Sequence, residues 1–304
     1  MTDDLLRFVK RELDVAVESE VTQVADELAQ TLHGVAVLYY GSTLRTGDFD
    51  GLLDFYVLTA HPTGTPLRRF WLRWLWPDVS YHEIAAGGRL IRAKVATMPL
   101  ATFERAAHGA YLDTTIWTRF VQPAALVWRA DPDVVARVTR AVAAAASTAA
   151  RFAAVVGPVE GPPAAFWQAL FRETYRAELR VEPPGREATI LHHAPARYDR
   201  LLPIAWTAGR VAFAQRGPAM VPQLGFDGWR DGAQAWLQRV SAGKALNLAR
   251  LVKASWTFDG AARYGAWKIE RHTGLHIALT PWRERHPILT GVGVLWQVMR
   301  RRVS

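Results

Sequence analysis

Three residues in the first third of the chain have types and a spacing that suit binding of a phosphorylated substrate. Gly41 and Ser42 follow the apolar run VAVLYY, and Asp54 lies 12 residues after Ser42 within the run LLDFYVL. Glycine lets the backbone approach a phosphate closely, and serine adds a hydroxyl and an amide as donors. A carboxylate is a preferred ligand of Mg²⁺, which usually keeps substrate phosphates in its shell. This pattern is typical of a nucleotidyltransferase site, which binds a nucleoside triphosphate.

Each of these features also has a structural interpretation. Gly-Ser is a common turn, and one buried aspartate is often a structural acid held by hydrogen bonds. The familiar nucleotidyltransferase pattern has two acids spaced as Asp-x-Asp, whereas Leu52 stands at the position of the first acid. The Gly-Ser turn and the lone aspartate by themselves favour the structural interpretation over the catalytic one.

A resemblance to one family favours the catalytic interpretation over the structural one. The sequence YGS at 40–42, followed by LLDF at 52–55, resembles the mitochondrial-type CDP-diacylglycerol synthases. These are phosphatidate cytidylyltransferases, also described as mitochondrial translocator assembly and maintenance proteins, and they carry a single acid in the second strand. Looser similarity extends over 92–100, 116–123, 253–260 and 263–271. The chain departs from the family at Thr43, where glycine is usual.

The resemblance implies transfer of CMP from CTP to phosphatidate, giving CDP-diacylglycerol and pyrophosphate. Asp54 would be the catalytic acid and metal ligand, with Asp50 as a second ligand of Mg²⁺ or another divalent cation. Gly41, Ser42 and Lys94 would bind the nucleotide, because charged donors grip phosphate oxygens well. Further candidate substrate-binding residues lie near the expected third strand and in the C-terminal motif: His82, Arg92, Lys253, Asp259, Arg263 and Lys268.

Three alternatives remain open from the sequence. The chain could be a nucleotidyltransferase with another acceptor, such as a sugar phosphate, an antibiotic or RNA. It could be a non-catalytic relative that binds nucleotide or lipid, or a structural partner in a membrane complex. The absence of an aromatic RNA-binding motif argues against nucleic acid as a partner. The sequence also lacks Walker A, dinucleotide-binding, HExxH and Gly-x-Ser-x-Gly motifs.

The composition sets limits on these functions. The chain has 304 residues, half of them hydrophobic, which is enough for a sizeable core and predicts about two domains. It has no cysteine, which excludes disulfides, zinc–thiolate sites and a cysteine nucleophile. The formal net charge of +9 favours anionic partners, although a generally basic proteome would have the same effect.

The elements expected around the motif are those of an α/β domain. Apolar spacing predicts one or two helices over 4–32 and strands at 35–40, 52–58, 89–98 and 123–128. Helices are expected at 66–76, 100–107, 114–120, 132–156, 164–180, 201–215, 228–254 and 261–272. With the resemblance, this pattern predicts a nucleotidyltransferase domain of the DNA polymerase β-like type over 1–130. A mainly helical region over 131–304 would close the cleft.

Two segments mix tryptophan with arginine in a way that suits a membrane surface. They are FWLRWLWP at 70–77 and GVGVLWQVMRRR at 291–302. Tryptophan favours the membrane interface, and arginine pairs with lipid phosphate. No apolar run reaches the ~20 residues needed to span a bilayer, and the charged N-terminus does not read as a signal peptide. We therefore expect a cytoplasmic protein, peripheral on the inner face of an anionic membrane.

Overall fold

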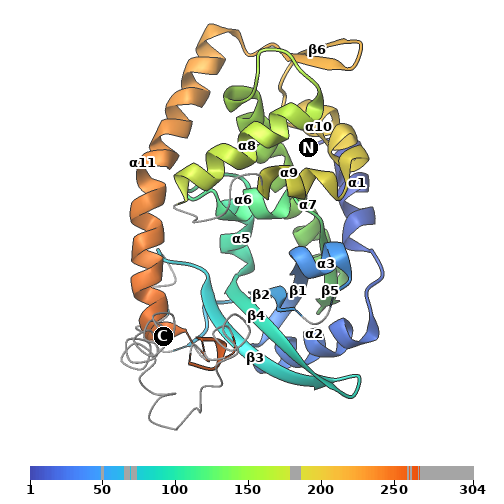
Figure 1. Cartoon of the computed structure of the whole chain (residues 1–304), viewed down its shortest axis with the longest axis vertical. Coiled ribbons are helices and arrows are strands. Elements are labelled where there is room, and N and C mark those ends of the chain that lie inside the picture. The colour runs from blue at the N-terminus through green and yellow to red at the C-terminus, as the bar shows by residue number, and fades with distance from the viewer. Residues whose placement is uncertain are drawn as a thin grey trace, which may run out of the picture.

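The computed structural model describes residues 1–48, 51–64, 69, 74–178, 186–258, 260, 262–265 and 267. Within these residues, a mixed sheet lies at one end of the molecule and a group of helices at the other, with one long helix along the side (Figure 1). The prediction of a mixed α/β fold is confirmed.

The sheet has five strands in the order β3-β4-β2-β1-β5. Their bounds are β1 (Gly34–Tyr40), β2 (Leu53–Thr59), β3 (Asp78–Ala86), β4 (Arg89–Pro99) and β5 (Ala124–Arg129). The β2–β4 pair is parallel, and the other neighbours are antiparallel. All four predicted strands are confirmed, whereas β3 was not predicted.

Both faces of the sheet are covered, which explains why β1 and β2 read as continuous apolar runs. Alternate residues of a strand point to opposite faces. Val37 and Tyr39 therefore pack in one cluster with helix α2 (Ser19–Thr31). Leu38 and Tyr40 pack in a second, larger cluster with helix α1 (Asp3–Leu13) and the helices that follow the sheet.

Helix α7 (Pro132–Val156) is the centre of the larger cluster. Its start has a side-chain cap, because Asp131 Oδ1 accepts a hydrogen bond from the amide of Val134 at 2.8 Å, and Pro132 occupies the first turn. Most of its alanines are buried, and such small side chains let neighbouring helices approach closely. Helices α1, α5 (Leu100–Ala107) and α6 (Thr115–Phe120) pack against it.

The remaining elements form the helical part of the molecule. They are α3 (Ser42–Thr46), α8 (Pro163–Ala177), α9 (Arg186–His192), α10 (Pro195–Ala208), β6 (Phe213–Arg216), β7 (Ala219–Pro222) and α11 (Gly225–Thr257). The prediction that the chain beyond residue 130 is mainly helical is confirmed within the described residues. The buried cluster around α7 includes residues from both sides of that boundary, and the division into two domains stays a prediction.

One predicted helix extended too far at its C-terminal end. A helix was expected over 201–215, but α10 ends at Ala208, and 213–216 is strand β6 of a hairpin that turns at Gly217. Gly217 has φ of +58°, a conformation that favours glycine. Most of the segments expected as helices at 66–76 and 261–272, and all of the basic tail at 291–302, lie outside the described residues.

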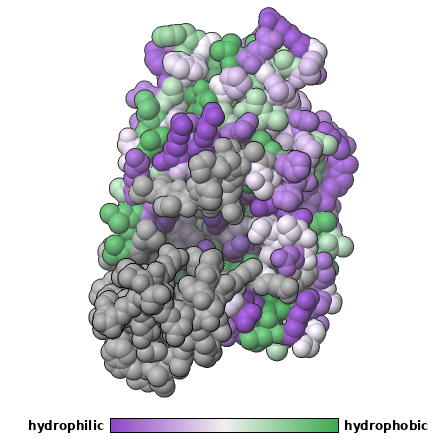
Figure 2. All heavy atoms as spheres, viewed as in Figure 1, coloured by the Kyte–Doolittle hydropathy of each residue, from purple (hydrophilic) through white to green (hydrophobic). Residues whose placement is uncertain are grey.

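Helix α11 runs along the whole edge of the molecule (Figure 1). Several of its large apolar side chains are exposed, and Figure 2 shows hydrophobic residues along this edge among hydrophilic ones. No helix in the described part of the chain is both long enough and apolar enough to cross a membrane.

Candidate functional site

Strand register brings the predicted nucleotide-binding residues together. Tyr40, the last residue of β1, pairs with Asp54 of β2, and Asp54 pairs with Lys94 of β4. Gly41 and Ser42 follow Tyr40 directly, so they lie at the same position along the sheet as the carboxylate. Asp54 is two residues before Tyr56 and therefore lies on the face of the sheet that carries Tyr40 and Tyr56.

Gly41 and Asp54 are in close contact. Gly41 has φ of +98° and ψ of −162°, a conformation essentially restricted to glycine. A Cβ at this position would lie 2.9 Å from the Oδ2 atom of Asp54, which is closer than real Cβ atoms approach. Backbone conformation and space therefore both require glycine here, and the turn leads directly into the short helix α3 at Ser42.

A cavity of about 240 Å³ opens at this point, and we refer to it as the Asp54 cavity. Its lining residues come from β1, α3, β2, β4, α6, α8 and α9 and from the turn after α6: Tyr40, Gly41, Ser42, Arg45, Asp54, Lys94, Arg119, Gln122, Pro123, Tyr175 and Ile190. Three of them are cations and one is a carboxylate. The lining thus carries an excess of positive charge that suits a polyanionic ligand.

Arg119 is a cavity residue that sequence reasoning did not select. Its Nη1 atom donates to the hydroxyls of Tyr40 at 3.3 Å and Tyr56 at 3.4 Å. The guanidinium also lies over both rings, 5.1 Å and 5.7 Å from their centroids. No ion pair joins Arg119 to a carboxylate in the described part of the chain. Two neutral hydroxyls and two rings orient this cation and leave its charge to act on a ligand.

Electrostatics keep Arg119 protonated. Burial disfavours its charged form, but the two tyrosines and the nearby Asp54 and Glu178 carboxylates raise the pKa of Arg119 above its usual range. Burial likewise raises the pKa of Tyr56. The Tyr56 hydroxyl therefore stays neutral near neutral pH, and both tyrosine hydroxyls accept hydrogen bonds from the arginine.

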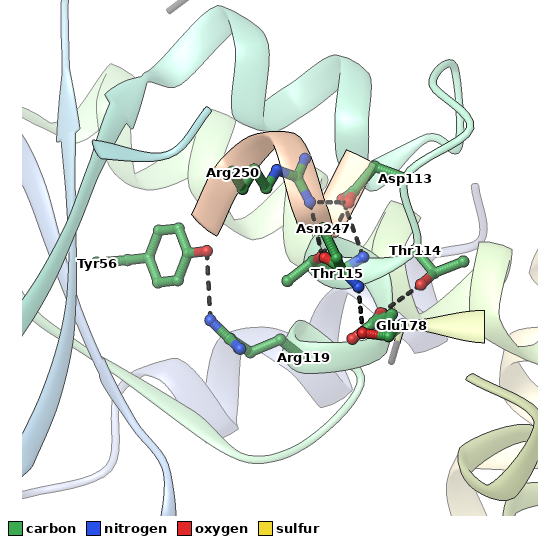
Figure 3. A network of polar contacts seen from close by, with 8 residues as sticks. All are labelled: Tyr56, Asp113, Thr114, Thr115, Arg119, Glu178, Asn247 and Arg250. Atoms are coloured by element: carbon green, nitrogen blue, oxygen red, sulfur yellow. Dashed lines mark hydrogen bonds and ion pairs between the residues drawn. The ribbon is translucent and has the colours of Figure 1, made fainter. Parts of the chain in front are cut away.

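A polar network holds the start of helix α6, which carries Arg119 (Figure 3). Asp113 accepts hydrogen bonds from the amide and the hydroxyl of Thr115, both at 2.9 Å. Arg250 of α11 forms an ion pair with Asp113. Alongside, the Thr114 hydroxyl donates to the Glu178 carboxylate at the end of α8, and Asn247 of α11 donates to the Glu178 main-chain oxygen. The network therefore joins α6, α8 and α11 behind the cavity.

The other predicted substrate-binding residues that the structure describes do not line the cavity. His82 lies on the edge strand β3, where its Nε2 is 2.8 Å from Ser80 Oγ. Arg92 lies on the neighbouring strand β4, where its Nε is 3.7 Å from Glu83 Oε1. Lys253 forms a buried ion pair with Asp78. Arg263 is exposed. Asp50, Asp259 and Lys268 lie outside the described residues.

The described residues of the cavity offer a divalent cation one carboxylate, to which substrate phosphates would add oxygen ligands. No group of three or more histidine, cysteine, aspartate or glutamate residues that could hold a metal occurs in the part of the chain that the structure describes. Asp54 is the single carboxylate among the described lining residues. Mg²⁺ is commonly bound by one or two carboxylates plus substrate phosphates. Asp54 is therefore a suitable ligand for a Mg²⁺ that arrives with a nucleotide.

Comparisons with known proteins assign no family. No protein-family model matches the chain, and a search of curated proteins found no significant match.

Proposed function

We propose that this protein is a phosphatidate cytidylyltransferase, which transfers CMP from CTP to phosphatidate. The main support is the contact between Gly41 and the Asp54 carboxylate, inside a cavity that also holds three cations. The arrangement is the one expected for a nucleotidyltransferase: a glycine-serine turn follows β1, the acid lies on the antiparallel neighbour β2, and β4 pairs with β2 in parallel. The choice of CTP and phosphatidate comes from the resemblance of the YGS and LLDF motifs.

In this proposal, an oxygen of the lipid phosphate attacks the α-phosphorus of CTP. The new bond forms as the bond between the α-phosphorus and the β-phosphate oxygen breaks, and pyrophosphate leaves. Asp54 would hold Mg²⁺, which when bound supplies neutralising charge to the phosphates. The Gly41 backbone and the Ser42 hydroxyl contact the triphosphate, and Lys94 and Arg45 neutralise its oxygens. Catalysis would come mainly from positioning and charge.

The lining residues suit an acceptor that is already anionic. Those that the structure describes include no histidine, and their one carboxylate is the proposed metal ligand. A hydroxyl acceptor would need a base to remove its proton, whereas a phosphate monoester is ionised near neutral pH. Arg119, with its two tyrosine partners, is available to hold this second phosphate.

The size of the cavity fits phosphates rather than whole substrates. Its 240 Å³ is below the roughly 300–1,000 Å³ of typical ligand pockets. The phosphates would bind inside, while the cytosine and the acyl chains would lie outside.

Because phosphatidate is a membrane lipid, we also propose a cytoplasmic protein that binds the inner face of a membrane peripherally. The Trp-Arg segments that motivate this proposal lie largely outside the described residues. Co-sedimentation with phosphatidate vesicles is its test, and a chain that stays in the supernatant at low salt would contradict it.

The function itself is tested by product formation. Purified protein is incubated with Mg²⁺, phosphatidate in mixed micelles and each of the four ribonucleoside triphosphates, and the lipid products are identified by mass spectrometry. We expect CDP-diacylglycerol and pyrophosphate from CTP, and loss of both in Asp54→Asn. If no nucleotidyl-lipid forms, the proposal that phosphatidate is the acceptor is contradicted. Parallel reactions with sugar phosphates would show whether another phosphate monoester is the acceptor.

A further inference from the structure

We infer that a groove between α1 and the first turns of α7, which we call the α1–α7 groove, binds a small amphiphilic anion. Such a ligand has a phosphate or carboxylate headgroup on an apolar chain. The inference goes beyond the proposed function, and it rests on different residues.

The groove encloses about 740 Å³. Its apolar surface comes from Leu6 of α1 and from Val135 and Ala136 of α7. Leu6 and Val135 are half-buried, whereas Ala136 is exposed. An apolar chain lying on these side chains would remove hydrocarbon surface from water on both sides, which is favourable by roughly 25 cal/mol per Å².

Cations surround this apolar surface. Lys10 on α1 and Arg140 on α7 line the groove from its two helices, and Arg129 lines it from the end of β5. All three are exposed, and none of their side chains has a hydrogen-bond or ion-pair partner within the described residues. A fourth cation, Arg7, pairs with Asp4 at 2.6 Å.

Asp131 is the single acid among the described residues that line the groove, and it does not neutralise the three cations. Asp131 uses one carboxylate oxygen to cap the start of α7 through the Val134 amide. This carboxylate therefore offsets the partial positive charge at the N-terminus of the 25-residue helix, and the three cations outnumber it. The groove is therefore complementary to an anionic headgroup.

The dimensions favour a small ligand over a protein. A volume of 740 Å³ lies within the range of small-molecule sites, roughly 300–1,000 Å³. A stable protein interface needs about 1,000 Å² or more of well-packed surface. The combination of an apolar surface with a cationic rim matches an amphiphile better than a fully polar anion.

The groove is separate from the Asp54 cavity. Strand β5 connects them, because Pro123, just before the strand, lines the cavity and Arg129, its last residue, lines the groove. A strand of 6 residues spans about 20 Å. One short-chain ligand in the groove would therefore not also fill the cavity.

Calorimetric titration of the full chain with dodecyl phosphate, below its critical micelle concentration, tests the inference. Dodecanoate, inorganic phosphate and dodecyl maltoside are the comparison ligands. We expect dodecyl phosphate or dodecanoate to bind at least tenfold more tightly than inorganic phosphate, and the better of the two identifies the headgroup. Binding of dodecyl maltoside as tight as that of the anionic amphiphiles, or no binding of any amphiphile, would overturn the inference.

Matched variants locate the binding. Lys10→Glu with Arg140→Glu is expected to lower the affinity at least tenfold, whereas Arg11→Glu with Arg172→Glu makes the same charge change outside the groove and is expected to keep it. Ala136→Trp fills the groove without altering charge and is also expected to abolish binding. Equal affinity in both double variants would place the binding elsewhere and overturn the inference. Circular dichroism checks folding, and nucleotide binding at the Asp54 cavity is expected to be unchanged in every variant, so the two proposals fail independently.

Discussion

Gly41 has a backbone conformation restricted to glycine and lies beside the Asp54 carboxylate. Gly41→Ala places a methyl group 2.9 Å from the Asp54 carboxylate in a conformation that costs about 1–3 kcal/mol for other residues. We expect it to weaken nucleotide binding at least tenfold, as measured by titration with CTP and Mg²⁺. Gly47→Ala is the control, because Gly47 also has a positive φ of +67° but has nothing within 4 Å of an added Cβ. Equal CTP affinity in both variants would show that the Gly41 turn is only structural.

Arg119 is expected to bind phosphate through its guanidinium. Arg119→Gln removes the charge but keeps a polar side chain beside Tyr40 and Tyr56, so we expect the apparent KM for phosphatidate to rise at least tenfold. Charge-assisted hydrogen bonds contribute about 1.5–3 kcal/mol, which agrees with this size of effect. Arg105→Gln is the control, since Arg105 also lies over a tyrosine ring, 5.0 Å from that of Tyr111, but does not line the cavity. An unchanged KM in Arg119→Gln would contradict this role.

The sequence predicted part of this cavity and missed part of it for a physical reason. Gly41, Ser42 and Asp54 are close in the chain, and a hairpin-like return of β2 along β1 is enough to bring them together. Lys94 followed from its place in a predicted strand. Arg119 reaches the cavity only because α6 packs under the sheet, and that packing depends on distant residues. The single basic residue in the apolar stretch IWTRFV was the available signal.

At the scale of elements, the ion pair between Arg250 and Asp113 fastens α11 to the start of α6. Both side chains are largely buried, with 16% and 6% of their surface exposed. Arg250→Met leaves Asp113 without its cation, and breaking such a pair costs about 3 kcal/mol. Urea denaturation is expected to show this loss. Arg230→Met on the same helix removes exposed pairs with Asp227 and Asp231 and is expected to cost less than about 1 kcal/mol. Similar losses in the two variants would contradict a specific fastening.

The elements that were predicted incorrectly show which signals are weak. Strand β3 has the sequence DVSYHEIAA, in which polar residues interrupt the apolar ones, because it is an edge strand of the sheet and only part of it is buried. The end of α10 was missed because VAFAQR after Gly209 is as compatible with a helix as with a strand. Pairing with β7 makes 213–216 a strand, and a pairing partner is not visible in local periodicity.

At the scale of the whole molecule, buried tyrosines predict how stability depends on alkaline pH. Burial raises the pKa of Tyr39 to about 12 and raises the pKa of Tyr198 as well. Between pH 10 and 12 the unfolded chain loses the Tyr39 proton while the folded chain keeps it, so the free energy of unfolding falls as the pH rises. Tyr198 shifts stability in the same direction. Below pH 10 these groups have no effect. Thermal denaturation from pH 8 to 11.5 measures the decline, and Tyr39→Phe is expected to make it shallower. A decline of equal slope in that variant would exclude Tyr39 as a contributor.

Fold class could be predicted for the molecule as a whole, since helices and strands differ clearly in apolar period. The buried cluster around α7, which both halves of the chain share, could not be predicted. Periodicity shows which face of a helix is apolar but not which partner covers it.

Thermal denaturation of the full chain with each ribonucleoside triphosphate, with and without Mg²⁺, tests the proposed nucleotide site most directly. A ligand at 100 times its Kd stabilises the folded state by about 2.7 kcal/mol, which corresponds to about 4 °C for a chain of this size. We predict that CTP with Mg²⁺ raises the Tm by this order, that the other nucleotides do so less, and that Asp54→Asn loses the Mg²⁺-dependent part. No stabilisation by any nucleotide, or the same Mg²⁺-dependent shift in wild type and Asp54→Asn, would contradict the assignment of this cavity.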